Sequence, residues 1–544
     1  IAPALWFQEG VRFISPQPDA VVFHGWADVF LHASFLDTFS SASGFHDLHG
    51  IFAAGSPLPL YHYAGYIVPA TLKAISGVPA VLVASSIMPC LGLFLVTLAA
   101  YCVGRIYLDG PGGMVAACAA ALLPDPSFYG VASRWNSYYF ILQVSATLGY
   151  AIALMGLALA LVMGGMKSHV RRPVIVGLVA TACVVWFKAP VAVAYSFGMA
   201  VLALAFMPDA SRRLRAWLST AALIGLIITV GILRSLPDVP TLEWRSAGPP
   251  ATIVAMLGAA VPAGLIAQVF AEPFQAARSH LAWLSVGAAI ALFGYFGAFA
   301  LLVPYGLRQA VRLRLPRPLV AYPVLVILNL LVIALLLAPN TSGRGDAFEI
   351  IHKTFAWPYF ATVTWSGALL GGTLVRRVER TAGGKLITVV LVALACVVPL
   401  TYGGHTLSGI GWSAGFDVRM PRGLHECAVF LRHHSEPGSI VQLQAPQRDP
   451  WLMLTAVSER PAYVGFYAGP RRPGPEERRR LALIDDVFRD PDTAAARRRL
   501  AGTGIDWLVT EEAQSPSWLR HLPPDFVSGT YRVYKVSTMS NGLP

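Results

Sequence analysis

Apolar runs of about 20 residues recur along this chain, and they restrict its fold more than any other feature. A helix needs about 20 such residues to cross the hydrocarbon core of a bilayer, which is roughly 30 Å thick. Hydrophobic residues make up 55% of the sequence and charged residues only 13%. The sequence therefore predicts a polytopic α-helical membrane protein and excludes a soluble enzyme.

The positions of these runs predict about 10 to 11 transmembrane helices. The eleventh would be a helix before Ile1, which would place the N-terminus in the cytoplasm. The ten expected spans cover residues 80–104, 111–125, 137–164, 173–187, 190–207, 217–234, 282–303, 319–338, 355–375 and 386–402.

Positive charge lies largely in short connections between these spans. The net charge is +12, and short loops rich in Arg and Lys stay on the cytoplasmic side of a membrane. Spans that alternate between such loops place the first loop and everything after Thr401 on the external face. Basic loops of this kind meet anionic lipid, and we expect no nucleic-acid partner. The basic loops are Lys167–Arg172, Ser211–Arg215, Arg308–Arg317 and Arg376–Lys385.

There are two further apolar segments. If either crossed the membrane fully, every later loop would lie on the opposite side from the one predicted. Residues 60–76 are expected to form an amphipathic helix that lies in the outer interface. Residues 251–270 are broken around Pro262, and such breaks are tolerated where the backbone lines protein or water. We expect this second segment to be re-entrant or interfacial.

From about Ser408 the composition becomes that of a soluble α/β domain. Helices are expected at LHECAVFLRHH, EERRRLALIDDVFR and DTAAARRRLAG, and strands at SIVQLQA, RPAYVGF, IDWLVTEE and TYRVYKVS. This alternation predicts a small sheet covered by helices. The expected domains are a transmembrane domain, 1–407, which includes an external loop at about 18–63, and an extracytoplasmic α/β domain, 408–544.

The loop Pro18–Tyr63 concentrates four Asp and five His ahead of the spans. Ionisable groups at a membrane are costly, and their presence indicates a function. If the residues around Asp28 are helical, Asp28 and His32 share one face. They could then act as a general base with its orienting partner, bind a divalent cation, or form a solvated surface pair. The cluster His46, Asp47 and His49 has no recognised ligand geometry, and a solvated turn is its simplest interpretation.

Three segments resemble the type C glycosyltransferase (GT-C) superfamily of integral membrane enzymes. The first is the acid Asp28 in WADVFLH, ahead of the spans. The second is GSPLPLYHYAGYIVPATLKAISG, which is similar to the interfacial helix after the first external loop of those proteins. The third is the tail with HECAVFLRHH, SERPAYVGFY and GTGIDWLVTEE, which is similar to the external domain of several bacterial branches. The D-x-x-x-H pattern departs from the paired acids of the oligosaccharyltransferases.

This resemblance implies an inverting hexosyl or pentosyl transfer from a polyprenyl-phosphate sugar, on the external face of a bacterial inner (plasma) membrane. The acceptor would be an envelope glycan, lipid or protein. Asp28 and His32 would be catalytic, with Mg or Mn as the cation if a metal takes part. A transporter or flippase of a lipid-linked saccharide, or a noncatalytic accessory subunit of a membrane complex, could use the same charges.

Further site residues are expected among the cations and polar groups on external segments. For Lys188 the alternative is that it snorkels to the interface from the end of a span. The expected residues for the donor phosphate are Arg134, Lys188, Arg278, His280, Arg344, His352 and Lys353. The expected residues for the acceptor or loop are Asp37, His46, Asp47, His49, Tyr61 and His62.

The four basic loops generate a prediction about topology. Single cysteines introduced at Ser211 and Ser342 should react with a membrane-impermeant thiol reagent from opposite sides, with Ser342 on the external side. Labelling of intact and opened vesicles measures this directly. Reaction of both positions from one side would contradict the alternation and would move the first loop into the cytoplasm.

Overall fold

The computed structural model describes residues 3–4, 13–41, 48–58, 63–123, 125, 137–208, 210–235, 242–244, 280–339, 353–379, 417–466, 473–490 and 493–540. The chain divides into two compact units. One unit, called here the helical unit, contains residues 1–5 and 89–411. The other, called the polar unit, contains residues 6–88 and 412–544, so it joins the segment before the apolar helices to the segment after them.

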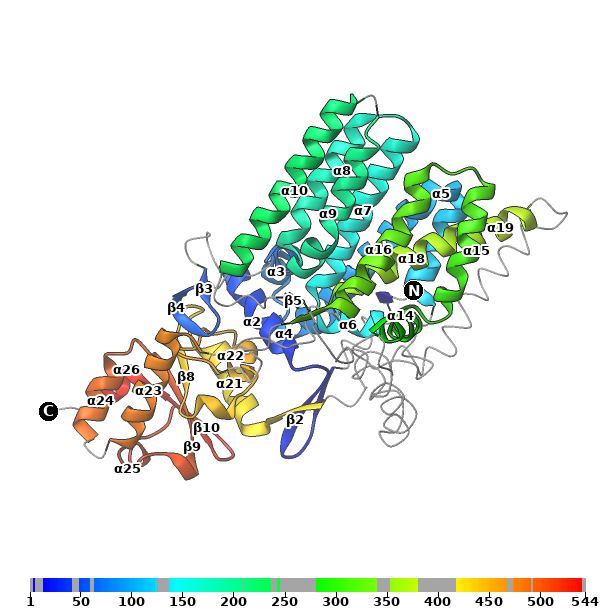
Figure 1. The fold of residues 1–544 in the computed structure, drawn as a ribbon. Helices are drawn as coiled ribbons and strands as arrows, with labels where there is room; N and C mark the ends of the chain where they lie inside the picture. The colour runs from blue at the N-terminus through cyan, green and yellow to red at the C-terminus, as the bar shows by residue number, and fades with distance from the viewer. Residues whose placement is uncertain are drawn as a thin grey trace. The chain divides into compact units, whose positions relative to one another are not determined.

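The helical unit is built from consecutive apolar helices, and α7 to α10 run side by side (Figure 1). The unit also contains a short antiparallel pair, β5 (Leu242–Trp244) and β6 (Leu337–Pro339). The described helices are α5 (Met88–Leu122), α6 (Tyr138–Val144), α7 (Thr147–Lys167), α8 (Arg171–Cys183), α9 (Ala189–Ala205), α10 (Arg212–Ser235), α14 (His280–Phe296), α15 (Ala298–Arg312), α16 (Arg317–Leu336), α18 (Ala356–Ser366) and α19 (Gly372–Glu379).

Three helices in the described part of the chain are long and apolar enough to cross a membrane. They are Ala80–Leu122, Thr147–Lys167 and Arg317–Leu335, and a bent pair, Gly287–Phe296 with Phe299–Arg312, adds a fourth if it is one span. The expected class, a polytopic helical membrane protein with a C-terminal α/β region, is confirmed. The count is below the expected ten, because helices such as α8 and α9 are shorter than a full crossing and residues 386–402 lie outside the described residues.

The chain changes direction at two residues with left-handed backbone angles. Asp109 (φ 49°) interrupts Ala80–Leu122 where the sequence predicts a break between two spans. Gly297 (φ 53°) separates α14 from α15, and the two helices are bent by 88°. The expected span at 282–303 therefore contains a sharp bend at Gly297. The sequence-based prediction did not account for Gly297, which adopts a backbone conformation that ends a helix at little cost.

Small residues let the helices of the helical unit approach one another closely. A Cβ atom at Gly104 would lie 2.4 Å from the carbonyl oxygen of Gly112, across the turn at Asp109. A Cβ atom at Gly149 on α7 would lie 2.9 Å from the Cα atom of Gly92 on α5. Because apolar surface is no driving force within lipid, close backbone packing of this kind holds such helices together.

The N-terminal part of the polar unit forms a sheet with a strand from the far end of the chain. β1 (Ile14–Pro16) pairs with β2 (Ala20–His24), and β2 pairs with β7 (Asp417–Pro421), both antiparallel. After β2 the chain forms α2 (Asp28–Ser41), the hairpin β3 (His49–Gly50) and β4 (Ala53–Pro57), α3 (Ala64–Ser76) and α4 (Ala80–Leu82). The sheet thus fixes the start of α2.

The helix expected within residues 60–76 is present as α3. Gly77, with φ 68°, ends it and donates its N–H to the carbonyl of Lys73, as in left-handed helix caps. One face, with Tyr66 and Ala70, is buried. The opposite face exposes Ile67 and Ile75 at 52% and 80%. A helix of 13 residues is too short to cross a bilayer, and its position in the outer interface stays a prediction.

The C-terminal part of the polar unit is a four-stranded sheet in the order β10-β11-β9-β8, with β8 parallel to β9 and the other pairs antiparallel. The expected helices and three of the four expected strands are present. The strands are β8 (Val441–Leu443), β9 (Trp507–Glu511), β10 (Phe526–Ser528) and β11 (Tyr531–Lys535), and the helices are α21 (Arg422–His434), α22 (Met453–Ser458), α23 (Pro475–Arg489), α24 (Thr493–Ala501), α25 (Ser517–Arg520) and α26 (Val536–Ser540).

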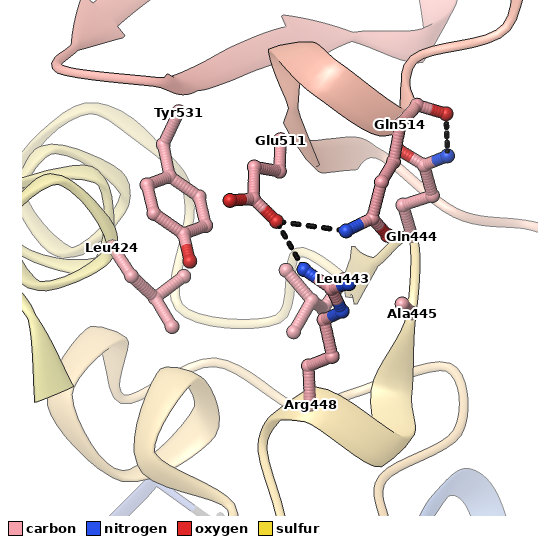
Figure 2. A pocket seen from close by; sticks show the side chains of 8 residues that line it. All are labelled: Leu424, Leu443, Gln444, Ala445, Arg448, Glu511, Gln514 and Tyr531. Atoms are coloured by element: carbon pink, nitrogen blue, oxygen red, sulfur yellow. Dashed lines mark hydrogen bonds and ion pairs between the residues drawn. The ribbon is translucent and has the colours of Figure 1, made fainter.

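The fourth expected strand, RPAYVGF, is wrong: only one bridge, between Ala462 and Val441, forms there. Pro461 has no N–H to contribute to a ladder, so its sequence cannot be a regular central strand. At the carboxyl ends of the parallel strands β8 and β9, β8 is followed by Gln444 and β9 ends at Glu511. The carboxyl ends of the two parallel strands thus carry polar side chains at one edge of the sheet (Figure 2).

The turn at Asp109 yields a prediction about packing. Gly104→Ala would force a methyl group against the Gly112 carbonyl, and overpacking of this kind costs about 1–3 kcal/mol. The thermal unfolding midpoint of the purified protein should fall. Gly198→Ala on α9 is the matched control, because a Cβ atom there meets nothing within 4 Å. Equal midpoints for the two variants would show that the two segments do not pack this tightly.

Candidate active site

Asp28 is the first residue of α2, and its side chain is half-buried. The preceding strand anchors this end of the helix, since the Phe23 ring of β2 packs against Phe30 of α2 with centroids 4.8 Å apart. A carboxylate in the first turn of a helix interacts favourably with the partial positive charge of the free N–H groups. The fold thus holds one acid at a defined, partly open position.

Trp26, two residues before Asp28 in the sequence, lies beside a second tryptophan, Trp451. Its ring centroid is 6.5 Å from that of Trp451, which follows β8 in the C-terminal part of the polar unit. Both side chains are partly exposed. Indole rings offer a large rigid face with a polar edge, which suits the apolar face of a sugar ring.

Asp449 fixes the segment that carries Trp451. Its buried carboxylate accepts the backbone N–H groups of Met453 and Leu454, both at 2.7 Å, and so caps the start of α22. Leu452, which lies between Asp449 and Met453 in the sequence, has φ 61°, a conformation that is unusual for Leu. Burial raises the pKa of Asp449 to about 6, although the backbone N–H groups oppose this shift.

His32 and Asp37, which the sequence places on α2 after Asp28, both face α3. His32 is buried, and its Nδ1 forms a hydrogen bond of 2.6 Å with the Tyr66 hydroxyl. Asp37 accepts a hydrogen bond from Lys73 Nζ at 3.1 Å. These two contacts attach α2 to the interfacial helix candidate α3.

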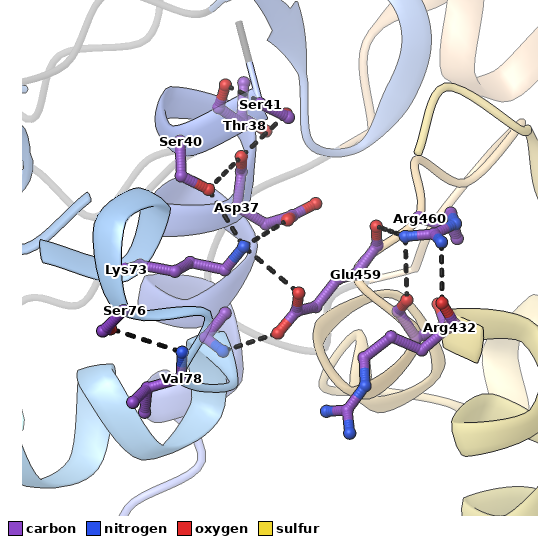
Figure 3. Close-up of polar contacts among 12 residues, drawn as sticks. Asp37, Thr38, Ser40, Ser41, Lys73, Ser76, Val78, Arg432, Glu459 and Arg460 are labelled. Atoms are coloured by element: carbon purple, nitrogen blue, oxygen red, sulfur yellow. Dashed lines mark hydrogen bonds and ion pairs between the residues drawn. The ribbon is translucent and has the colours of Figure 1, made fainter. Parts of the chain in front are cut away.

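A largely buried ionic group connects the loop segments with the C-terminal part of the same unit (Figure 3). Lys73 Nζ also lies 3.1 Å from Glu459 Oε2, at the end of α22, and Glu459 Oε1 accepts the Ala80 N–H at 2.7 Å. Burial raises the pKa of Asp37 to about 6, while Lys73 acts in the opposite direction. One cation thus holds two carboxylates from distant parts of the sequence.

The described phosphate-binding candidates lie in the helical unit. Lys188 is 1% exposed and stands between a 3₁₀ turn (Val184–Trp186) and α9, so protein covers its side chain. Lys353 lies just before α18 and is partly buried. His280 is the first residue of α14, and His49 begins β3 in the polar unit, but their side chains are not described.

The remaining expected site residues lie outside the described part of the chain. They are Arg134, Arg278, Arg344 and His352 among the phosphate candidates, and His46, Asp47, Tyr61 and His62 among the acceptor candidates. The segment 251–270, expected to be re-entrant, also lies there. Their roles stay predictions.

Sequence reasoning missed a buried acid in the helical unit. Asp125 is 0% exposed, and its Oδ2 accepts hydrogen bonds from the Ser137 hydroxyl at 2.6 Å and the Tyr139 N–H at 3.3 Å. It also missed Trp451 and Asp449. The signal for Asp449 was an Asp-Pro pair ahead of an apolar stretch, which is typical of a helix N-terminus. An acid at the end of an apolar run would have indicated Asp125.

The described residues contain no group of three His, Cys, Asp or Glu side chains placed to hold a metal ion. Of the expected pair, His32 is buried and uses Nδ1 in its hydrogen bond with Tyr66. Asp28 and His32 alone do not supply the three or more ligands that a metal centre needs.

Fold and site together define an integral membrane protein that carries an acid and an aromatic pair in its polar unit. No protein-family model and no curated protein matches the sequence. Among solved structures, the chain is similar to an oligosaccharyltransferase from Archaeoglobus fulgidus tethered to an acceptor peptide, with 12% identity and a TM-score of 0.41, over 94% of this chain and 68% of that one. The archaeal oligosaccharyltransferase AglB from the same organism, with an inhibitory peptide and a dolichol-phosphate, matches with 13% identity, a TM-score of 0.41, and 94% and 69% coverage. At these values the similarity carries no information on donor, acceptor or active-site residues.

The buried carboxyl of Asp449 generates a prediction about pH. Because its pKa in the folded protein, about 6, lies above the ordinary value of 3.8, the folded state binds this proton more tightly than the unfolded state. The resulting stabilisation is complete below about pH 4 and is lost as the pH rises through 6, and it amounts to roughly 3 kcal/mol. The wild-type protein should therefore lose more stability between pH 4 and pH 7 than Asp449→Asn.

Thermal unfolding of the full-length protein at several pH values measures this difference. Asp485→Asn on α23 is the control, because Asp485 is half-exposed and pairs with Arg489 of the same helix at 3.3 Å. A pH dependence in Asp449→Asn that equals the dependence of the wild type would contradict the prediction.

Proposed function

We propose that this protein is an inverting membrane glycosyltransferase that transfers a sugar from a polyprenyl-phosphate donor to an acceptor of the cell envelope. The observation that supports this most is Asp28, a partly open acid at the start of α2, with Trp26 two residues before it and Trp451 beside Trp26. The helix α3, which packs against α2, exposes an apolar face of the kind that lies at a membrane surface. An acid so close to an interfacial helix would meet substrates whose lipid part remains in the bilayer.

In the proposed reaction, Asp28 acts as the general base. An acceptor hydroxyl would donate its proton to the carboxylate while its oxygen attacks the anomeric carbon of the donor sugar. The new carbon–oxygen bond forms as the bond to the lipid phosphate breaks, so the anomeric configuration inverts. Trp26 and Trp451 would hold a sugar ring by its apolar face and limit its orientations.

The departing lipid phosphate gains negative charge, and a cation or hydrogen-bond donor that meets this charge stabilises the transition state. Lys188 is the described candidate with the best environment, since an ionisable residue buried in a membrane helix bundle is costly unless it has a function. Lys353 is the second described candidate. The alternative that Lys188 snorkels to the surface conflicts with its 1% exposure.

A transporter or flippase of a lipid-linked saccharide is the second candidate function, and the same buried Lys188 would favour it by lining a substrate path. The two functions differ in the fate of one bond. A transferase breaks the sugar–phosphate bond and releases polyprenyl phosphate, whereas a flippase moves the intact molecule across the bilayer.

Asp28→Asn tests the base. The substitution keeps the size of the side chain and removes its ability to take a proton, so transfer should fall by roughly 100-fold or more while donor binding is retained. The measurement is release of polyprenyl phosphate from a labelled donor by purified protein in lipid, with a crude envelope fraction as acceptor.

Asp19→Asn is the matched control, because Asp19 belongs to the same sheet region, is 77% exposed and pairs with Arg419. Full activity of Asp28→Asn would remove Asp28 from the role of base. Movement of the labelled donor across the bilayer with its sugar–phosphate bond intact would overturn the transferase and support the flippase.

A further inference from the structure

Two helices of the helical unit, α8 and α10, begin close to each other, and both begin with arginines. α8 starts at Arg171 and α10 at Arg212, and a second arginine follows in each. Arg171 Nε donates a hydrogen bond of 2.8 Å to the carbonyl of Pro208, which lies shortly before α10. The two helices run side by side with α7 and α9 (Figure 1). Their first turns, residues 171–174 and 212–215, are called here the basic end.

Positive side chains are unfavourable at the start of a helix. The first N–H groups of a helix have no partner within it, and their partial positive charge repels cations and attracts anions. Neither α8 nor α10 has an acid in its first turn, and no side chain caps the start of α8. Residues 167–174 and 206–215 together contain six Lys or Arg but one acid, Asp209. The basic end thus adds positive charge where the backbone already carries it.

The six cations fall into two groups. Three donate hydrogen bonds of 2.7 to 3.4 Å to backbone carbonyls, which balance their charge in part, and they are Lys167, Arg171 and Arg215. The other three are exposed and have no hydrogen bond or ion pair with a described residue, and they are Arg172, Arg212 and Arg213. These three guanidinium groups are therefore available to an anion.

Exposed apolar side chains stand beside these free arginines. Residues four apart share one face of a helix, so Val176 lies one turn after Arg172 on α8, and Trp217 lies one turn after Arg213 on α10. Val176 is exposed, and Trp217 is 76% exposed. Tryptophan is enriched at the headgroup level of membranes. A ligand at the basic end thus meets positive charge and apolar surface together, which fits a phospholipid better than a soluble anion.

We propose that Arg172, Arg212 and Arg213 bind the headgroup of an anionic phospholipid whose acyl chains lie along the exposed apolar faces of α8 and α10. The lipid phosphate accepts charge-assisted hydrogen bonds from the arginines and offsets the positive charge of two helix starts. The expected sidedness of the basic loops assigns this lipid to the cytoplasmic leaflet. The site belongs to the helical unit, so the inference does not rest on the function proposed for Asp28.

Thermal unfolding of the purified full-length protein in neutral detergent, with and without phosphatidylglycerol, tests this site. The variant carries Arg172→Gln, Arg212→Gln and Arg213→Gln together. Without anionic lipid, it should unfold at the same temperature as the wild type or at a higher one, because like charges at two helix starts are removed. With phosphatidylglycerol, the wild type should be the more stable protein. Native mass spectrometry should show that the variant binds this lipid roughly tenfold more weakly or less.

A second triple variant, with Arg308→Gln, Arg312→Gln and Arg314→Gln, is the matched control. It also removes three exposed arginines from a basic loop, but this loop follows the end of α15, where free carbonyl groups favour cations. The control should keep the wild-type response to phosphatidylglycerol. Phosphatidylcholine and inorganic phosphate at the same concentration should not shift the unfolding of the wild type, which separates an anionic headgroup from lipid in general and from a free anion.

Four results would overturn the inference. They are the absence of any effect of phosphatidylglycerol on the folded wild type, an unchanged response in the first triple variant, an equal loss of response in both triple variants, and an equal shift with inorganic phosphate or phosphatidylcholine. Arg172→Gln alone should lose part of the response, and it replaces the first triple variant if that protein does not fold.

Discussion

The pairing of β2 with β7 is the constraint on which the rest of the polar unit depends. It places residues 20–24 beside residues 417–421, and every other contact between the two parts of this unit follows from that register. Lys73 then bridges Asp37 and Glu459, and Trp26 meets Trp451. Without this strand pair, Asp28 and Trp451 would belong to two separate parts of the structure.

The cost of the Lys73 group indicates that position matters more here than stability. Burying a cation with two carboxylates requires desolvation of all three, and apolar residues of equal volume often stabilise a protein as well or better. A buried ionic group does discriminate strongly between correct and incorrect pairing, since any misplacement leaves a charge without a partner. We interpret the group as a device that fixes α2 and α22 relative to each other, and with them Asp28 and Trp451.

Local patterns in the sequence predicted the helices and strands that depend on local interactions. Amphipathic periodicity was sufficient for α21, α23 and α24, and the short apolar runs for β8, β9 and β11. The pattern failed for RPAYVGF, where Pro461 removes an N–H, and at Gly297, where one backbone angle bends an expected span. The pairing of β2 with β7, the indole pair and the buried ions of Lys73 join residues hundreds of positions apart. A single sequence carries no local signal for such contacts.

Two buried ionisable residues in the described part of the helical unit lie where helix ends provide matching partial charge. Lys188 follows the end of a helical segment, where free carbonyl groups carry partial negative charge, and Asp125 meets the first N–H groups of α6, which carry partial positive charge. The sequence indicated Lys188 because an isolated Lys stood in an apolar context. Asp125 was missed because its partners, Ser137 and Tyr139, lie 12 and 14 residues further along the chain.

The discontinuous construction of the polar unit has a consequence for biosynthesis. β2 ends at His24 and β7 begins at Asp417, so at roughly 5–20 residues per second β2 waits between about 20 and about 80 seconds for its partner strand. During that interval one side of β2 is an open strand edge, which is prone to pairing with other chains. The order of synthesis therefore makes membrane insertion of the intervening helices a step that must finish before the polar unit can close, and slow insertion would appear first as aggregation of the N-terminal segment.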